Sequence, residues 1–107
     1  MANTFKNALV KNAGTAGSTI YVPPAGKKSI IIELDVANTY TSSVLIDVYI
    51  NSGGQDYYVV KGAPVPYGSS LQVISGQKIV LEDGDTIKAK SSVNSSIDIV
   101  ASILEDI

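Results

Sequence analysis

Residues 29–38 of this 107-residue chain read Ser-Ile-Ile-Ile-Glu-Leu-Asp-Val-Ala-Asn, and this stretch decides the fold class. Side chains two positions apart point to the same face of a strand. One face therefore carries Ile30, Ile32, Leu34 and Val36, and the other carries Ile31, Glu33, Asp35 and Ala37. Apolar alternation built from β-branched residues predicts a strand, and we assign its first face to the core.

The same alternation continues along the rest of the chain, in place of helical periodicity. The clearest further segments are residues 44–51, 57–61, 77–82, 86–91 and 96–104, with weaker ones at 5–11, 18–22 and 70–74. Turn-forming residues separate them, and Asp83-Gly84 predicts a hairpin. Short strands at this spacing predict an all-β fold, an antiparallel β-sandwich of about 8–9 strands. Alternation gives faces and not neighbours, so jelly-roll and immunoglobulin-like strand orders both stay open.

Composition indicates one globular unit. A hydrophobic fraction of 45% with 17% charged residues is typical of a folded domain and not of a disordered chain. No linker divides the sequence, so residues 1–107 are predicted to form a single domain, with residues 1–4 as a candidate flexible N-terminal arm. Apolar runs are shorter than the roughly 18 residues of a membrane span, and the first residues lack the apolar core of a signal peptide. We expect a soluble protein made in the cytoplasm.

Residue types that catalysis needs are scarce. The chain has no Cys, His or Trp, and all eight of its cations are lysines. Without His, its serines lack their usual base, and we predict no enzyme activity, cofactor or metal site. The charge of −2 and the lack of Arg disfavour nucleic-acid binding. Glu33, Asp35 and Asp47 could form a glycosidase-like carboxylate pair, but a solvated strand face has the same composition and is the favoured interpretation.

Strand parity also predicts which apolar side chains point outward. It places Val44, Ile46, Val48, Ile50, Ile79, Leu81, Ile87, Ala89, Ile97, Ile99, Ala101 and Ile103 in the core. The candidate protein-contact residues left on the other face are Ile31, Leu45, Tyr49, Tyr57, Val80, Val100 and Leu104. Clustered together, they would form an apolar patch of the kind found at protein interfaces. The alternative for any one of them is cover by a neighbouring loop or terminal strand.

Tyrosines leave a second class of function open. Tyr21, Tyr40, Tyr49 and Tyr67 fall at predicted outward or corner positions. Tyrosine is frequent at protein interfaces, but its ring and hydroxyl also suit a sugar-binding surface. A carbohydrate- or receptor-binding β-sandwich module would show a shallow groove lined by tyrosines and carboxylates.

Three strings of the sequence resemble a known group of proteins. They are Val22-Pro-Pro-Ala-Gly-Lys-Lys-Ser-Ile-Ile-Ile-Glu-Leu-Asp-Val-Ala-Asn-Thr, Tyr58-Val-Val-Lys-Gly-Ala-Pro-Val-Pro-Tyr-Gly-Ser-Ser-Leu and Gln77-Lys-Ile-Val-Leu-Glu-Asp-Gly-Asp-Thr-Ile-Lys. In order and spacing they resemble small β-sandwich structural proteins of tailed-bacteriophage virions. Their motifs are corner and strand chemistry that other sandwiches share.

The resemblance implies a protein of the virion, made in the host cytoplasm and present in many copies. Within that group a capsid decoration (cement) protein is favoured, with the major capsid protein or other virion proteins as partners. A neck or tail component is the alternative. We also expect a homo-oligomer, for which the resemblance implies a trimer. The charge, the lack of Arg and the short apolar runs predict no contact with nucleic acid or membrane.

Overall fold

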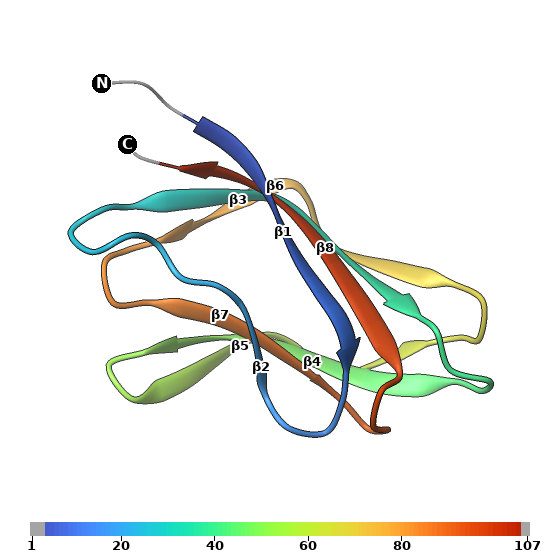
Figure 1. Ribbon diagram of the computed structural model, residues 1–107. Coiled ribbons are helices and arrows are strands. Elements are labelled where there is room, and N and C mark those ends of the chain that lie inside the picture. The colour runs from blue at the N-terminus through green and yellow to red at the C-terminus, as the bar shows by residue number, and fades with distance from the viewer. Residues whose placement is uncertain (1–3, 106–107) are drawn as a thin grey trace.

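The computed structural model describes residues 4–105, and this range forms eight strands and no helix (Figure 1). The strands are β1 (Thr4–Ala13), β2 (Ser18–Tyr21), β3 (Ser29–Asn38), β4 (Val44–Ser52), β5 (Gln55–Val65), β6 (Ser70–Leu81), β7 (Thr86–Ser91) and β8 (Ile97–Glu105). The predicted all-β class is confirmed. Thr4, part of the predicted flexible arm, already belongs to β1, and residues 1–3 of that arm lie outside the described range.

The strands form two four-stranded sheets, in the orders β1-β8-β3-β6 and β2-β7-β4-β5. Within each sheet, every pair of neighbouring strands is antiparallel. The first half of the chain pairs with the second in nested order: β1 with β8, β2 with β7, β3 with β6, and β4 with β5. This is the jelly-roll arrangement, so the alternative left open by the sequence is decided.

The core lies between the two sheets. Its largest fully buried side chains are Ile31, Leu34, Val36, Val44, Ile46, Val48, Ile74, Leu81, Ile87, Ile97, Ile99 and Ile103. Parity predicted most of these correctly, β8 entirely so: its inward residues alternate with Asp98, Val100 and Ser102. The interior is aliphatic, and it forms one continuous cluster.

The first part of β3 departs from the prediction. Ile31 was predicted to face outward, but it is 0% exposed, whereas Ile30 and Ile32 are partly exposed. Ile31 pairs with Ile103 of β8, and the next matched pair is Glu33 with Ser102, so β3 carries one extra residue at this point. A β-bulge of this kind reverses the parity of everything before it. The prediction was right after the bulge and wrong before it.

Two predicted turns also differ. Residues 70–74 and 77–82 were expected to be separate strands, but β6 runs through both, and Gly76 (φ 80°) and Lys78 (φ 56°) form an irregularity inside it. Asp83-Gly84 does form a turn, closed by the Asp85 N–H donating to the Glu82 carbonyl at 3.0 Å. It is not a hairpin, because β6 and β7 belong to different sheets. Gly53 and Gly54 close the β4–β5 hairpin.

The two ends of the described chain lie side by side, as Figure 1 shows, because Thr4 of β1 pairs with Glu105 of β8. A polar network ties this end of the sandwich together. The Tyr21 hydroxyl hydrogen-bonds the Ser29 hydroxyl at 2.9 Å and donates to the Glu105 carboxylate, which also pairs with Lys6 at 3.6 Å. Burial, followed by the hydrogen bond to Glu105, raises the pKa of Tyr21 to about 12. The network therefore links β1, β2, β3 and β8.

Candidate protein-contact surface

An apolar row crosses the outer face of the β1-β8-β3-β6 sheet. Strand register places Phe5 beside Leu104, Leu104 beside Ile30, and Ile30 beside Val80. Phe5 is 74% and Val80 52% exposed, and Ile30 and Leu104 are partly exposed. We call these four residues the apolar row. At the usual strand spacing it extends about 14 Å, which is the scale of a protein-contact patch and not of an isolated surface residue.

A second apolar pair lies further along the same face. Leu9 of β1 is 68% exposed and stands beside Val100 of β8, which is 48% exposed. Between this pair and the apolar row, Asn7 and Ser102 occupy the matching positions. The face therefore alternates apolar and polar bands, as a contact surface with a polar surround does.

The edges of both sheets carry features that hinder strand addition. Gly62 (φ 66°) and Pro64 interrupt β5, Gly76 and Lys78 distort β6, and the short β2 is followed by Pro23 and Pro24. On β1 the lysines Lys6 and Lys11 are exposed. Bulges, prolines and lysines are common means of protecting a sheet edge. The faces are thus better suited than the edges to binding a partner.

Two carboxyl groups lie beside the apolar row. Glu33 and Asp35 point to the outer face of β3, and the residues paired with Glu33 across β6 and β8 are Ser75 and Ser102. A hydrogen bond with Asp35, followed by the Asp35 charge, raises the pKa of Glu33. The Asp35 Oδ1 atom is buried and has no hydrogen-bond partner among the described residues. Negative charge is thus concentrated at one side of the row.

The predicted contact residues divide between the two sheets. Val80 and Leu104 come together in the apolar row, and Val100 lies on the same face. Leu45 and Tyr57 are 51% and 60% exposed, but they belong to the other sheet. These five side chains are exposed or partly exposed, as predicted, whereas Ile31 is buried at the bulge. Their role in contacts stays a prediction.

Tyr49 was predicted to be exposed but is only 6% exposed. It does point outward from β4, and its ring lies against that of Tyr58 with centroids 5.2 Å apart. The loop between β1 and β2 covers it from the other side: at Gly17 the backbone passes so close to the Tyr49 hydroxyl that a side chain there would collide with it. For Tyr49, the alternative given by the sequence therefore holds: a neighbouring loop covers the side chain.

The sequence prediction missed three residues of this face. Phe5 and Leu9 lie in a segment read as a weak strand, to which no face was assigned. Their spacing with the intervening Asn7 was the available signal. Ile30 was assigned to the core because a bulge leaves no mark in the alternation itself.

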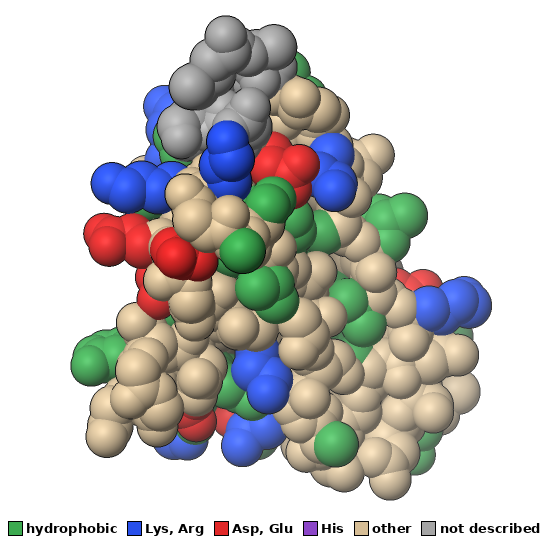
Figure 2. Space-filling model, turned by 60° about the vertical axis from the view of Figure 1, so that its left-hand side comes forward, with side chains coloured by type: hydrophobic (Ala, Val, Ile, Leu, Met, Phe, Trp, Pro, Cys, Tyr) green, Lys and Arg blue, Asp and Glu red, His purple; other side chains and the backbone are tan. Residues whose placement is uncertain are grey.

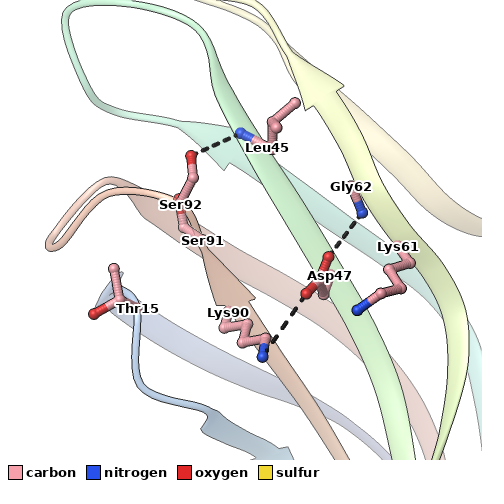
Figure 3. Close-up of a pocket in the computed structure, with 8 residues that line it drawn as sticks. All are labelled: Thr15, Leu45, Asp47, Lys61, Gly62, Lys90, Ser91 and Ser92. Atoms are coloured by element: carbon pink, nitrogen blue, oxygen red, sulfur yellow. Dashed lines mark hydrogen bonds and ion pairs between the residues drawn. The ribbon is translucent and has the colours of Figure 1, made fainter.

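The other sheet carries a shallow hollow of about 460 Å³ on its outer face, drawn in Figure 3. Its lining residues are Thr15, Leu45, Asp47, Lys61, Gly62, Lys90, Ser91 and Ser92. The Asp47 carboxylate accepts a hydrogen bond from the Gly62 N–H at 2.7 Å and pairs with Lys90 at 3.9 Å. This lining has one carboxylate, already engaged, and no tyrosine, so it differs from the groove expected of a carbohydrate site.

Charge is mixed on the side of the molecule that Figure 2 draws. Figure 2 shows one side of the molecule, where hydrophobic side chains form small groups among lysines and carboxylates. Within residues 4–105, no three acidic, His or Cys side chains gather as a metal site would require. No helix of that range is long and apolar enough to cross a membrane.

Comparison with known proteins gives structural neighbours but no family. No family model and no curated protein matches the sequence. The Drosophila FKBP39 nucleoplasmin-like N-terminal domain matches at 18% identity with a TM-score of 0.53, over 98% of this chain and 91% of that one. A Bacillus endospore appendage protein, from disulfide-linked pili, matches at 14% identity and TM-score 0.50, over 98% and 88%.

A pentameric capsid protein from metagenomic phage sequences matches at 20% identity and a TM-score of 0.49, over 96% of this chain and 60% of that one. At these identities the neighbours of higher TM-score share a fold with this chain, and the likeness shows that fold alone.

Proposed function

We propose that this chain is a structural protein of a tailed-phage virion, most specifically a decoration protein of the capsid, which works through protein–protein contacts and without catalysis. The observation that carries the proposal is the apolar row on an open sheet face, in a molecule whose sheet edges are protected against strand addition. The sequence resemblance supplies the virion context for such a contact surface.

A rigid fold supports the same proposal. In the nested pairing, each of the first four strands is hydrogen-bonded to one of the last four, and the aliphatic core is continuous. A decoration protein needs a stable scaffold and contact faces, and it needs no active site. A neck or tail component has the same requirements, so copy number separates the two.

The test is quantitative mass spectrometry of purified virions from the phage that encodes this chain. Hundreds of copies, in a simple ratio to the major capsid protein, are expected for a decoration protein. About six or twelve copies would place the chain on the neck or tail axis, because those structures have cyclic symmetry. Absence from the virion, together with selective binding on a glycan array, would overturn the proposal in favour of a carbohydrate-binding module.

A further inference from the structure

Charge along β3 changes sign across the apolar row. Lys28 is exposed and stands two positions before Ile30, and Glu33 and Asp35 follow Ile30 on the same strand. Lys28 lies one residue before the start of β3, and strand alternation continued by one step would place it on the outer face. Along the direction of β3, the outer face therefore presents first the Lys28 cation, then the apolar row, and then the two carboxyl groups of Glu33 and Asp35.

Such a pattern is complementary to itself when reversed. If two copies place their outer faces together with a two-fold axis along the apolar row, each β3 lies over the partner's β3 in the opposite direction. Each row side chain then meets its own equivalent: Phe5 meets Phe5, and Val80 meets Val80. The same rotation carries Lys28 of each copy over Glu33 of the other. Self-complementarity of this kind is what a two-fold interface requires.

We infer that the outer face of the β1-β8-β3-β6 sheet binds a second copy of this chain, in a two-fold dimer centred on the apolar row with Lys28 opposite Glu33. This inference rests on the proposed function only in taking this face as the contact surface. It replaces the expected trimer with a dimer, and it leaves other surfaces, including the outer face of the second sheet, for contact with the virion.

The exposed apolar side chains and the charged groups of this face fit this arrangement. Phe5, Val80 and the partly exposed Ile30 and Leu104 would lose contact with water, which is the main driving force of association. Glu33, whose pKa is raised by the neighbouring Asp35 carboxyl, would gain one cation, Lys28 of the other copy, across the interface. An interface with other virion proteins on this face would place no such demand on Lys28.

The first measurement is the molar mass of the full chain by light scattering after size exclusion, over a concentration series. We expect a shift from 11.2 kDa to twice that mass as the concentration rises. Val80→Asp should keep the chain monomeric throughout. Val22→Asp is the matched control, because Val22 is exposed to nearly the same extent (49% against 52%) and lies outside the β1-β8-β3-β6 sheet, and it should dimerise like the unchanged chain.

Charge reversal tests the register of the dimer. Lys28→Glu and Glu33→Lys should each raise the dimer dissociation constant about ten- to a hundredfold, because each places like charges together twice. The double variant should recover most of the affinity. Thermal melts establish that every variant is folded, and the charge pair keeps the test decisive if Val80→Asp does not fold.

A mass of 11.2 kDa at all concentrations, a trimer mass, or failure of the double variant to recover would overturn the dimer. Failure here is distinct from failure of the proposed function. A monomer present in hundreds of copies per virion would refute the dimer alone, and a dimer absent from virions would refute the virion role alone.

Discussion

Ile30, Ile31 and Ile32 are chemically identical neighbours, and the bulge gives them different environments. Ile31 enters the core, whereas Ile30 joins the apolar row at the surface. We predict that Ile31→Ala lowers the free energy of unfolding by about 2–5 kcal/mol, the usual cost of removing a buried aliphatic side chain. Ile30→Ala should cost less than about 1 kcal/mol in the monomer.

Urea denaturation of the two variants below the dimerisation range measures this difference. Equal losses, or a larger loss at Ile30, would contradict the burial of Ile31 and the exposure of Ile30.

Glu33 gives a second prediction at the scale of one residue. Because its pKa is raised in the folded protein, the folded state holds this proton more tightly than the unfolded state does. The contribution of Glu33 to stability is therefore fully present below its unfolded pKa and is lost as the pH rises through the raised value. Glu33→Gln should remove this part of the pH dependence, and Asp35→Asn should reduce it by removing the partner.

Thermal unfolding measured from roughly pH 3 to pH 7, the range in which carboxyl groups titrate, tests the prediction. An unchanged slope in Glu33→Gln would contradict the raised pKa of Glu33 in the folded protein.

Strand β2 is only four residues long, and side-chain contacts hold it in place. Tyr21, at its end, joins it to β3 and β8 through Ser29 and Glu105. Tyr21→Phe removes both bonds and leaves Glu105 less satisfied, so we expect a loss of about 1–3 kcal/mol in the free energy of unfolding. Tyr67→Phe, at an exposed corner position, should change it by less than about 0.5 kcal/mol.

The same variant has a signature at high pH. Since the pKa of Tyr21 rises from 10.0 to about 12 on folding, its contribution to stability is present below pH 10.0 and is lost between the two values. The loss of stability over this interval should be smaller in Tyr21→Phe than in the unchanged chain. An identical decline in both would argue against a buried Tyr21 hydroxyl.

The β1–β2 loop packs against β4 at Gly17. Gly17→Ala should destabilise the protein, because the new methyl group would meet the Tyr49 hydroxyl. Tyr49→Phe removes the atom that collides, so the double variant should be more stable than the sum of the two single changes predicts. A double-mutant cycle measured by chemical denaturation gives this coupling, and a coupling near zero would contradict the close approach.

Strand limits were more predictable than strand neighbours. The limits of β3 and β7 follow from alternation and from the turn residues beside them, and both were predicted at residues 29–38 and 86–91. β6 was predicted as two strands because Ser75-Gly76 has turn composition, but pairing with β3 carries the backbone through it. The apolar row was found only in part, because Ile30 reaches it through a bulge set by partner strands.

At the scale of the whole molecule, nested pairing makes most contacts distant in sequence. β1 cannot complete its sheet until β8 has been made, and the β4–β5 hairpin is the one local pair among the described strands. A chain with new ends at the exposed Gly53 and Gly54 and a short linker joining the old ends should therefore keep the fold. Circular dichroism and light scattering would show the same sheet content and the same mass as the parent chain. Loss of either would mean that the hairpin is needed to start folding.

The pairing of Thr4 with Glu105 also sets how the molecule responds to force. A force that pulls the two ends apart acts at the end of the β1–β8 pair, perpendicular to the strands. The hydrogen bonds between these strands therefore break one after another and not all together. A pull on the sheet faces is instead shared by many side chains at once. We therefore expect the fold to resist a larger force when a partner holds its sheet faces than when its two ends are pulled apart.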